Sequence, residues 1–262
     1  MKKQHLPDLT IMMSIRIDSP DRLANVKASL WYYRKYTDAH FMIIESDSES
    51  RLSELMQLEF PEVEYIFVKD HNPMLHRTYL MNEEFRRIKT SNAANIDVDI
   101  IVPIEQLIAA NDAVLRGEYV MAIPYDGRVV LSPKEFADIF RETLEIGALT
   151  EIDAYQQLMF GFASLGGAYV VDVARYRELG WENEHFLCWG PEDMERFHRL
   201  DILGHRPLQI VGKCYHLPHS RGINSGDTVP EMVLSTKKEY HKMLSMNQIE
   251  LKKYIQTWNW IK

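Results

Sequence analysis

The chain has 262 residues, which suits one large α/β domain or two small ones, and 46% of its residues are hydrophobic, enough for an ordinary core. Its formal net charge of −8 argues against a general nucleic-acid binder, because such proteins neutralise phosphates with a basic face. Two cysteines imply no disulfide framework, and no apolar run approaches the roughly 18 residues of a transmembrane helix. We therefore expect a soluble chain in a reducing compartment, the cytoplasm.

The first hundred residues alternate between predicted strands and helices. Continuous apolar runs predict the strands, and a helical spacing of apolar residues predicts the segments between them. Ser19 suits a helix N-cap and Pro20 suits the first helical position. Strands are expected at 9–17, 41–45, 63–68 and 94–102, and helices at 22–36 and 74–89. This alternation predicts an α/β fold with a mostly parallel, Rossmann-like sheet, helices on both faces, and ligands at the carboxyl ends of the strands.

The second half of the chain combines shorter elements with a Gly-rich, aromatic stretch from about Met159. Asp126 and Gly127 mark a tight turn, and Gly204 suits the end of a helix. Helices are expected at 104–115, from 133 onward, at 191–203 and in the amphipathic tail 231–260, and strands at 119–123, 129–131 and 209–215. Because we find no internal repeat or long linker, we expect one domain over 1–262 with a small C-terminal subregion.

Asp97 and Asp99 lie in the fourth expected strand, so both side chains should face one side while Val98 enters the core. Two carboxylates this close repel each other, and a bound divalent cation would remove the conflict. Hard oxygen ligands suit Mg²⁺ or Mn²⁺. The alternative is a solvated strand end with two incidental aspartates, against which the apolar residues on either side argue.

His216 and His219 follow the strand expected at 209–215, and Pro218 between them disfavours a helix. A turn here would aim both imidazoles at one cation, and imidazole combined with carboxylate favours Mn²⁺ over Mg²⁺. Arg221 adds a charge that suits a diphosphate. The alternative is that one histidine caps a loop and the other is exposed.

Glu192 and Asp193 lie in the first turn of the helix expected at 191–203, where Gly190 suits the N-cap. Favourable interaction with the helix dipole explains acidic residues here without any further function. It does not explain the adjacent Trp189. A tryptophan face is a common platform for sugar rings, so this residue suggests a sugar-binding site. A carboxylate held ionised in an aromatic cleft is suited to act as a general base.

Together these motifs resemble those of the β-1,4-galactosyltransferase family and its bacterial chondroitin-synthase-type relatives. The family's Asp-Val-Asp-hydrophobic-Ile-Pro strand is similar to 97–103, and its Arg-x-x-x-x-Asn helix resembles 77–82. Its Gly-Gly and Gly-Trp-Gly-x-Glu-Asp motifs are similar to 166–167 and 188–193, and its His-Ser-Arg resembles 219–221. The resemblance covers roughly 9–225. It implies the GT-A fold, a nucleoside-diphosphate sugar donor and inversion at the anomeric carbon.

The resemblance also implies a role for each matching residue. The metal, Mn²⁺ or Mg²⁺, would be bound by Asp99, His216 and His219, and Asp193 would be the catalytic base. The acceptor would be bound by Glu192, Trp189 and Gly190. The donor would be bound by Asp97, Arg77, Asp18, Arg22, Asp47 and Gly167. On this basis 1–103 would be the nucleotide-binding half, 104–230 the acceptor-binding half and 231–262 a helical tail.

Three positions depart from the family pattern. Cys188 and Pro191 replace glycines, so the closing motion of the family's acceptor loop is not implied for this chain. Ser164 replaces a bulky tyrosine that favours galactose over N-acetylgalactosamine, which leaves the donor sugar open. The printed sequence contains no counterpart of the membrane anchor of the animal enzymes, so we expect a bacterial-type cytoplasmic enzyme.

We therefore expect a metal-dependent inverting glycosyltransferase that transfers a hexose or N-acetylhexosamine from a UDP-sugar to a sugar hydroxyl. The acceptor would be a saccharide or lipid-linked saccharide in polysaccharide or lipopolysaccharide synthesis. One alternative is a sugar nucleotidyltransferase, but the glycine- and lysine-rich triphosphate loop of such enzymes is missing near the amino terminus. The other is a non-catalytic protein that binds carbohydrate or nucleotide-sugar on the same fold.

The tail places Trp258 and Trp260 among lysines, a composition that also suits peripheral contact with the inner face of a membrane. Packing of these side chains against the domain is the alternative that we expect.

Overall fold

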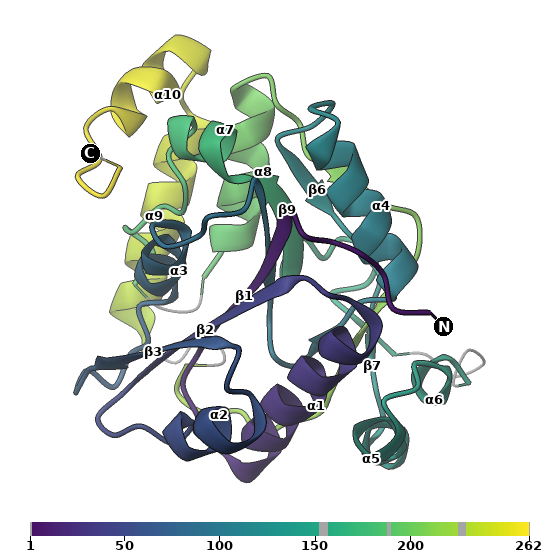
Figure 1. Cartoon of the computed structure of the whole chain (residues 1–262). Coiled ribbons are helices and arrows are strands. Elements are labelled where there is room, and N and C mark those ends of the chain that lie inside the picture. Colours follow the sequence, from purple (N-terminus) through teal and green to yellow (C-terminus); the bar gives the residue numbers. More distant parts are fainter. Residues whose placement is uncertain (1, 152–156, 188–189, 225–228, 262) are drawn as a thin grey trace.

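A seven-stranded sheet forms the centre of the computed structural model, which describes residues 2–151, 157–187, 190–224 and 229–261 (Figure 1). The order of strands across this large sheet is β3-β2-β1-β4-β9-β6-β10. In chain order they are β1 (Leu9–Ile15), β2 (His40–Asp47), β3 (Glu64–Lys69), β4 (Asn92–Ile96), β6 (Met121–Ile123), β9 (Ala168–Asp172) and β10 (Leu208–Gln209). Neighbouring strands are parallel except at β9, which is antiparallel to β4 and β6. The mostly parallel sheet expected from the sequence is confirmed.

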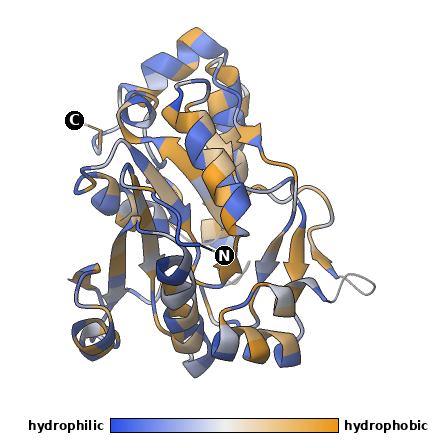
Figure 2. Ribbon diagram, turned by 45° about the vertical axis from the view of Figure 1, so that its right-hand side comes forward, coloured by the Kyte–Doolittle hydropathy of each residue, from blue (hydrophilic) through white to orange (hydrophobic). Residues whose placement is uncertain are grey.

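Helices cover both faces of the large sheet. All of β4 is buried, and so is β1 apart from the half-buried Ser14, although successive side chains of a strand point to opposite faces. One helix, α3, packs against β1 and β2, and another, α4, packs against β4, β6 and β9. Figure 2 shows the hydrophobic strands at the centre and mixed hydropathy on the surrounding helices. The described helices are α1 (Pro20–Tyr36), α2 (Ser53–Glu59), α3 (Arg77–Phe85), α4 (Ile104–Leu115), α5 (Lys134–Thr143), α6 (Gly147–Thr150), α7 (Val173–Glu178), α8 (Glu192–Ile202), α9 (Pro230–Leu244) and α10 (Gln248–Ile255).

Local helix signals match the structure where the partner groups are close in sequence. The Ser19 hydroxyl accepts a hydrogen bond from the Arg22 amide at 3.2 Å, and Pro20 occupies the first turn of α1. At the end of α8, Gly204 has a φ of +84°, the left-handed conformation expected after a helix C-terminus. The helix expected at 104–115 is α4, with the same boundaries.

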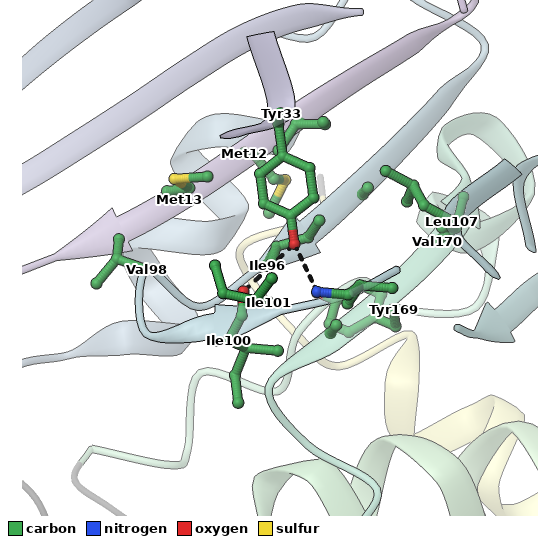
Figure 3. Packing of buried hydrophobic residues seen from close by; sticks show 14 of the residues in the cluster. Met12, Met13, Tyr33, Ile96, Val98, Ile100, Ile101, Leu107, Tyr169 and Val170 are labelled. Atoms are coloured by element: carbon green, nitrogen blue, oxygen red, sulfur yellow. Dashed lines mark hydrogen bonds between the residues drawn. The ribbon is translucent and has the colours of Figure 1, made fainter. Parts of the chain in front are cut away.

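A second sheet of four described strands, which we call the small sheet, was not expected from the sequence. Its strands are β5 (Ile100–Ile101), β7 (Val129–Leu131), β8 (Leu158–Met159) and β11 (Cys214–His216), in the order β5-β11-β7-β8. Tyr33 of α1 joins it to the rest of the fold. The Tyr33 hydroxyl donates to the Ile100 carbonyl at 3.3 Å and accepts from the Val102 amide at 3.0 Å, at the centre of a buried cluster (Figure 3).

Two predicted strands are wrong because the chain changes sheets within each. Residues 94–102 are not one strand: β4 ends at Ile96, and a turn closed by the Ile100 amide and the Asp97 carbonyl, 2.9 Å apart, leads to β5. Residues 209–215 likewise divide between β10 and β11, with Gly212 at a φ of +131° between them. Asp97 and Asp99 therefore project from a turn and not from one face of a strand.

The turn expected at Asp126 and Gly127 is present, with Gly127 at a φ of +93°, and it connects β6 of the large sheet to β7 of the small sheet. Because the Gly127 backbone packs closely on the Phe162 carbonyl, a Cβ at this position would lie 2.4 Å from that oxygen. The conformation and the close packing both favour glycine here.

The tail forms two helices, and the single helix expected at 231–260 is wrong. Asn247 starts α10 with a capping box, in which its side chain accepts from the Glu250 amide and the Glu250 carboxylate accepts from the Asn247 amide. Trp258 is only 1% exposed and packs on Gly180, where an added Cβ would lie 2.6 Å from the ring. The tail tryptophan thus packs against the domain, as expected. Among the described residues, no helix has the length and apolar character needed to span a bilayer.

Candidate active site

A cavity of about 610 Å³ lies beside the carboxyl end of β4, between the small sheet and the start of α8. Residues from several distant parts of the chain line it. Those expected from the sequence are Arg22, Arg77, Asp97, Asp99, Gly167, Gly190, Glu192, Asp193, His216 and His219. The structure therefore brings most of the predicted site residues to one cavity.

One wall of the cavity, which we call the metal-side wall, contains Asp99, His216 and His219. One potential ligand atom from each side chain lies within 4.8 Å of the others. The backbone of the small sheet creates this proximity, because β11 pairs antiparallel with β5 so that His216 is opposite Ile100. The Leu217 amide also donates to the Asp99 carbonyl at 2.7 Å. A carboxylate oxygen and two imidazole nitrogens form a donor set that suits Mn²⁺.

Asp99 is buried, and its charge is balanced by cationic or protonatable groups. Its Oδ2 atom lies 3.0 Å from His219 Nε2 and 3.3 Å from Arg22 Nη1. Burial opposes ionisation of Asp99, but the hydrogen bond from His219 and the nearby charge of Arg22 hold its pKa well below its usual range. Burial lowers the pKa of His216 and so favours the neutral imidazole that a metal ligand requires.

Asp97 is placed by strand β9. The Gly167 carbonyl, directly before β9, accepts a hydrogen bond from the Asp97 amide at 2.8 Å, and the Asp97 carboxylate pairs with the Arg77 guanidinium. Gly167 has a φ of +86°, and an added Cβ would lie 2.9 Å from the Ile100 side chain. Burial raises the pKa of Asp97 above its usual range, although Arg77 opposes the shift.

A second part of the lining, which we call the base-side wall, is formed by Gly166, Glu192 and Asp193. The Asp193 carboxylate lies so close to Gly166 that an added Cβ there would be 1.9 Å from Oδ2. Glu192 is buried, and its Oε2 accepts from the Gly190 amide at 3.1 Å. Burial, together with the charge of Asp193, raises the pKa of Glu192 well above its usual range. This wall therefore presents one carboxyl group that favours its neutral form beside a second carboxylate.

Two of the predicted residues are not among the described lining of the cavity. Asp18 accepts from Arg22 Nε at 2.9 Å and so touches a residue of the cavity without being among its described lining. Asp47 is also outside that lining, at the end of β2, where its Oδ1 accepts from the Ser48 amide at 2.7 Å. Trp189 lies outside the described residues.

Sequence reasoning missed the residues that support the base-side wall. Arg196 donates to Asp193 Oδ1 at 2.7 Å, and the Tyr125 hydroxyl donates to the Gly166 carbonyl. The spacing of Asp193 and Arg196, three residues apart on one helix, is a signal that the sequence contains. Glu182, which pairs with Arg196, gives no such signal because it lies outside that helix.

Comparisons of the whole fold identify its class. No protein-family model and no curated protein matches the sequence. The structure is similar to that of GalNAc-T7 with UDP, GalNAc and Mn²⁺, with a TM-score of 0.60 and 12% identity over 96% of this chain. This chain spans about half, 51%, of that protein.

The structure is also similar to that of glucosyl-3-phosphoglycerate synthase from Mycobacterium tuberculosis in complex with Mn²⁺, UDP and glucosyl-3-phosphoglycerate. The TM-score is 0.53 and the identity 12%, over 90% of this chain and 78% of that one. A second structure of the synthase, with Mn²⁺, UDP and phosphoglyceric acid, gives 0.53 and 11% over 88% and 78%. These similarities show the fold, which is the GT-A fold expected from the sequence.

Proposed function

We propose that the chain is a metal-dependent inverting glycosyltransferase that uses a UDP-sugar. The observation that supports this most is a single cavity with a three-residue donor set on one wall and a carboxylate from a helix start on the other. The comparison structures of the same fold contain UDP and Mn²⁺, which supports the choice of nucleotide and metal.

Asp99, His216 and His219 would bind the cation, and their one oxygen and two nitrogens suit Mn²⁺ better than Mg²⁺. When bound, the cation supplies positive charge that stabilises the departing diphosphate. Arg22 and Arg77 also line the cavity, and their positive charges would add to that of the cation. Asp97, paired with Arg77, is placed to accept hydrogen bonds from the ribose or the donor sugar.

Asp193 would take the proton from the attacking hydroxyl of the acceptor. The hydroxyl oxygen forms a bond to the anomeric carbon while the bond from that carbon to the diphosphate breaks, and UDP leaves with the electron pair. Attack from the face opposite the leaving group inverts the configuration. Glu192 would bind acceptor hydroxyls beside Asp193, and its raised pKa favours a protonated carboxyl that can donate a hydrogen bond.

The finer assignment is a hexosyl or N-acetylhexosaminyl transfer of the galactose or N-acetylgalactosamine type, as in the β-1,4-galactosyltransferase family. Ser164 lines the cavity with a small side chain, which leaves room for an acetamido group on the donor. The acceptor would be a saccharide or lipid-linked saccharide, as in polysaccharide or lipopolysaccharide synthesis.

The test combines donor binding and turnover. Calorimetry with a panel of UDP-sugars, with and without Mn²⁺, should show binding that depends on Mn²⁺. A Mn²⁺-dependent release of UDP should follow with the preferred donor. Asp193→Asn should reduce that release at least about a hundredfold, because a general base contributes roughly 10²–10⁴ in rate, and should retain Mn²⁺-dependent UDP binding.

Two outcomes would contradict the proposal. Unimpaired turnover by Asp193→Asn would remove the proposed base. Donor binding without any turnover in the unmutated chain, with or without saccharide acceptors, would favour a non-catalytic nucleotide-sugar-binding protein.

A further inference from the structure

Arg196 is a buried arginine directly behind the Asp193 carboxylate. Its side chain is 3% exposed, and its Nη1 donates to Asp193 Oδ1 at 2.7 Å. Its other face is held by Glu182, which accepts from Nη2 at 2.7 Å and from Nε at 2.9 Å. Two parallel hydrogen bonds to Glu182 therefore fix the plane of the guanidinium, and this fixes the direction in which Nη1 donates.

Glu182 is itself immobilised in the core. Its Oε1 accepts from the Tyr169 hydroxyl at 2.7 Å and from the Tyr176 hydroxyl at 2.8 Å, and the residue is 1% exposed. The guanidinium carbon of Arg196 also lies 4.4 Å from the centroid of the Tyr169 ring. The carboxylate, the guanidinium and both phenols thus form one closed network that ends at Asp193.

The two carboxylate oxygens of Asp193 have different surroundings. Oδ1 faces Arg196, and Oδ2 faces Gly166, where the close approach leaves no space for a side chain. Arg196 and Glu182 neutralise each other, so the network can orient the Asp193 carboxylate without cancelling its charge. A general base needs both a fixed direction and a retained negative charge.

We infer that Arg196 is a positioning residue for the base: paired with Glu182, it fixes the direction of the Asp193 carboxylate and leaves Oδ2 to receive the proton of the acceptor. This inference rests on the proposed function, because it assigns a role to the carboxylate that the function uses.

Arg199 provides a matched control one turn further along α8. It is also fully buried and paired with a glutamate, since its Nε donates to Glu195 Oε1 at 2.9 Å and its Nη2 donates to the Trp181 carbonyl at 2.6 Å. None of its described hydrogen bonds involves Asp193. Arg199→Lys therefore disturbs the same helix and leaves the hydrogen bonds of Asp193 unchanged.

The first experiment compares Arg196→Lys with Arg199→Lys in the full chain. Each variant is checked by circular dichroism, thermal unfolding and Mn²⁺-dependent UDP binding. Arg196→Lys should lower kcat about tenfold to a hundredfold. The ammonium group cannot form the paired hydrogen bonds to Glu182 while donating to Asp193, and an error of about 1 Å in the position of a catalytic group lowers the rate by up to about 10². KM for the donor should change less than about threefold, and Arg199→Lys should change kcat by less than about threefold.

The second experiment measures the pH profile of kcat in Arg196→Gln and Glu182→Gln. If Arg196 had a purely structural role, the two substitutions would not shift the acid limb of this profile in opposite directions. Arg196→Gln removes the cation beside Asp193, so the acid limb of the profile should move to higher pH. Glu182→Gln leaves the Arg196 charge unbalanced, so the acid limb should move to lower pH while kcat falls.

Equal losses of kcat in Arg196→Lys and Arg199→Lys, or shifts of the acid limb in the same direction, would overturn the inference. If the Arg196 variants fail to fold, the profile of Glu182→Gln decides: an acid limb unchanged from that of the unmutated chain overturns it. Asp193→Asn distinguishes the two levels, because full turnover in that variant contradicts the proposed function itself. Loss of turnover in Asp193→Asn together with no effect in Arg196→Lys contradicts only the role of Arg196.

Discussion

The two walls of the cavity are built by different kinds of interaction. On the metal-side wall, backbone pairing of β5 with β11 places Asp99 beside His216, and the chain after Pro218 adds His219. On the base-side wall, Asp193 comes from the first turn of a helix and is held by the buried side chain of Arg196. One wall is thus positioned mainly by main-chain hydrogen bonds and the other mainly by a side-chain ion pair.

The walls also differ in their charge balance. Asp99 is surrounded by His219, His216 and Arg22, which favour its ionised form. Glu192 is buried beside a like charge, which favours its protonated form. A wall that gathers an ionised carboxylate and imidazoles is suited to bind a cation, and a wall that places a buried carboxyl group with a raised pKa beside a second carboxyl group is suited to bind hydroxyls.

The largest effect is expected on the metal-side wall. Asp99→Asn should weaken Mn²⁺-dependent UDP binding at least about a hundredfold, because it removes the anionic ligand and leaves His219 and Arg22 without their carboxylate partner. Calorimetry with UDP and Mn²⁺ measures this, and the exposed Asp8→Asn serves as the control. Unchanged affinity would show that the cation binds elsewhere.

A smaller effect, confined to turnover, is expected at Gly166 on the base-side wall. Gly166→Ala should lower kcat about tenfold or more, because the new Cβ would overlap the Asp193 carboxylate and displace it. UDP binding with Mn²⁺ should persist, since the metal-side wall is unchanged. Gly147→Ala, where an added Cβ meets nothing within 4 Å, should keep full activity. A loss of UDP binding in Gly166→Ala would contradict the independence of the two walls.

The third prediction concerns the free energy of unfolding, at the buried carboxyl group of Glu84 on α3. Burial raises the pKa of Glu84 from 4.5 to about 8, although its side chain accepts from the Ser14 hydroxyl at 2.5 Å and from the Met13 amide at 3.1 Å. Because the pKa of Glu84 is raised in the folded state, its contribution to the free energy of unfolding is fully present below about pH 4.5 and is lost as the pH rises through about 8. The contribution should fall by about 1.4 kcal/mol per pH unit between these values.

Glu84→Gln keeps a neutral group of the same shape, so its unfolding free energy should not show this loss. Denaturant titrations at pH 5, 6 and 7 test the difference in slope between variant and unmutated chain. Parallel curves would show that Glu84 ionises normally in the fold.

Much of the first half of the fold could be predicted because its signals are local. The alternation of apolar runs with helical spacing led to the parallel strands β1 to β4, and Ser19 and Pro20 marked the start of α1. The division of 94–102 could not be predicted. Its apolar residues suit a strand in either sheet, and only the partner strands decide where one sheet ends and the other begins.

For the candidate site, the motifs point to residues that the structure brings together, but they do not predict the arrangement of those residues. Asp99, His216, His219 and Asp193 were selected from motifs, and the structure gathers them at one cavity. The expectation that Asp97 and Asp99 lie on one face of a strand is wrong, because both residues project from a turn. Glu182 could not be predicted, since its ion pair with Arg196 joins a residue outside α8 to the helix and leaves no periodic pattern in the sequence.

The sequence by itself determined which chemical groups are available and where helices such as α1 and α4 lie, because capping and apolar periodicity act within a few residues. Only the tertiary structure decided that β9 runs antiparallel beside β4, which sets Gly167 against Asp97, and that β11 pairs with β5, which sets His216 beside Asp99. These pairings join residues about 70 to 115 positions apart. Backbone hydrogen bonds of that range depend on which strands meet in space, and the same local pattern is compatible with several partners.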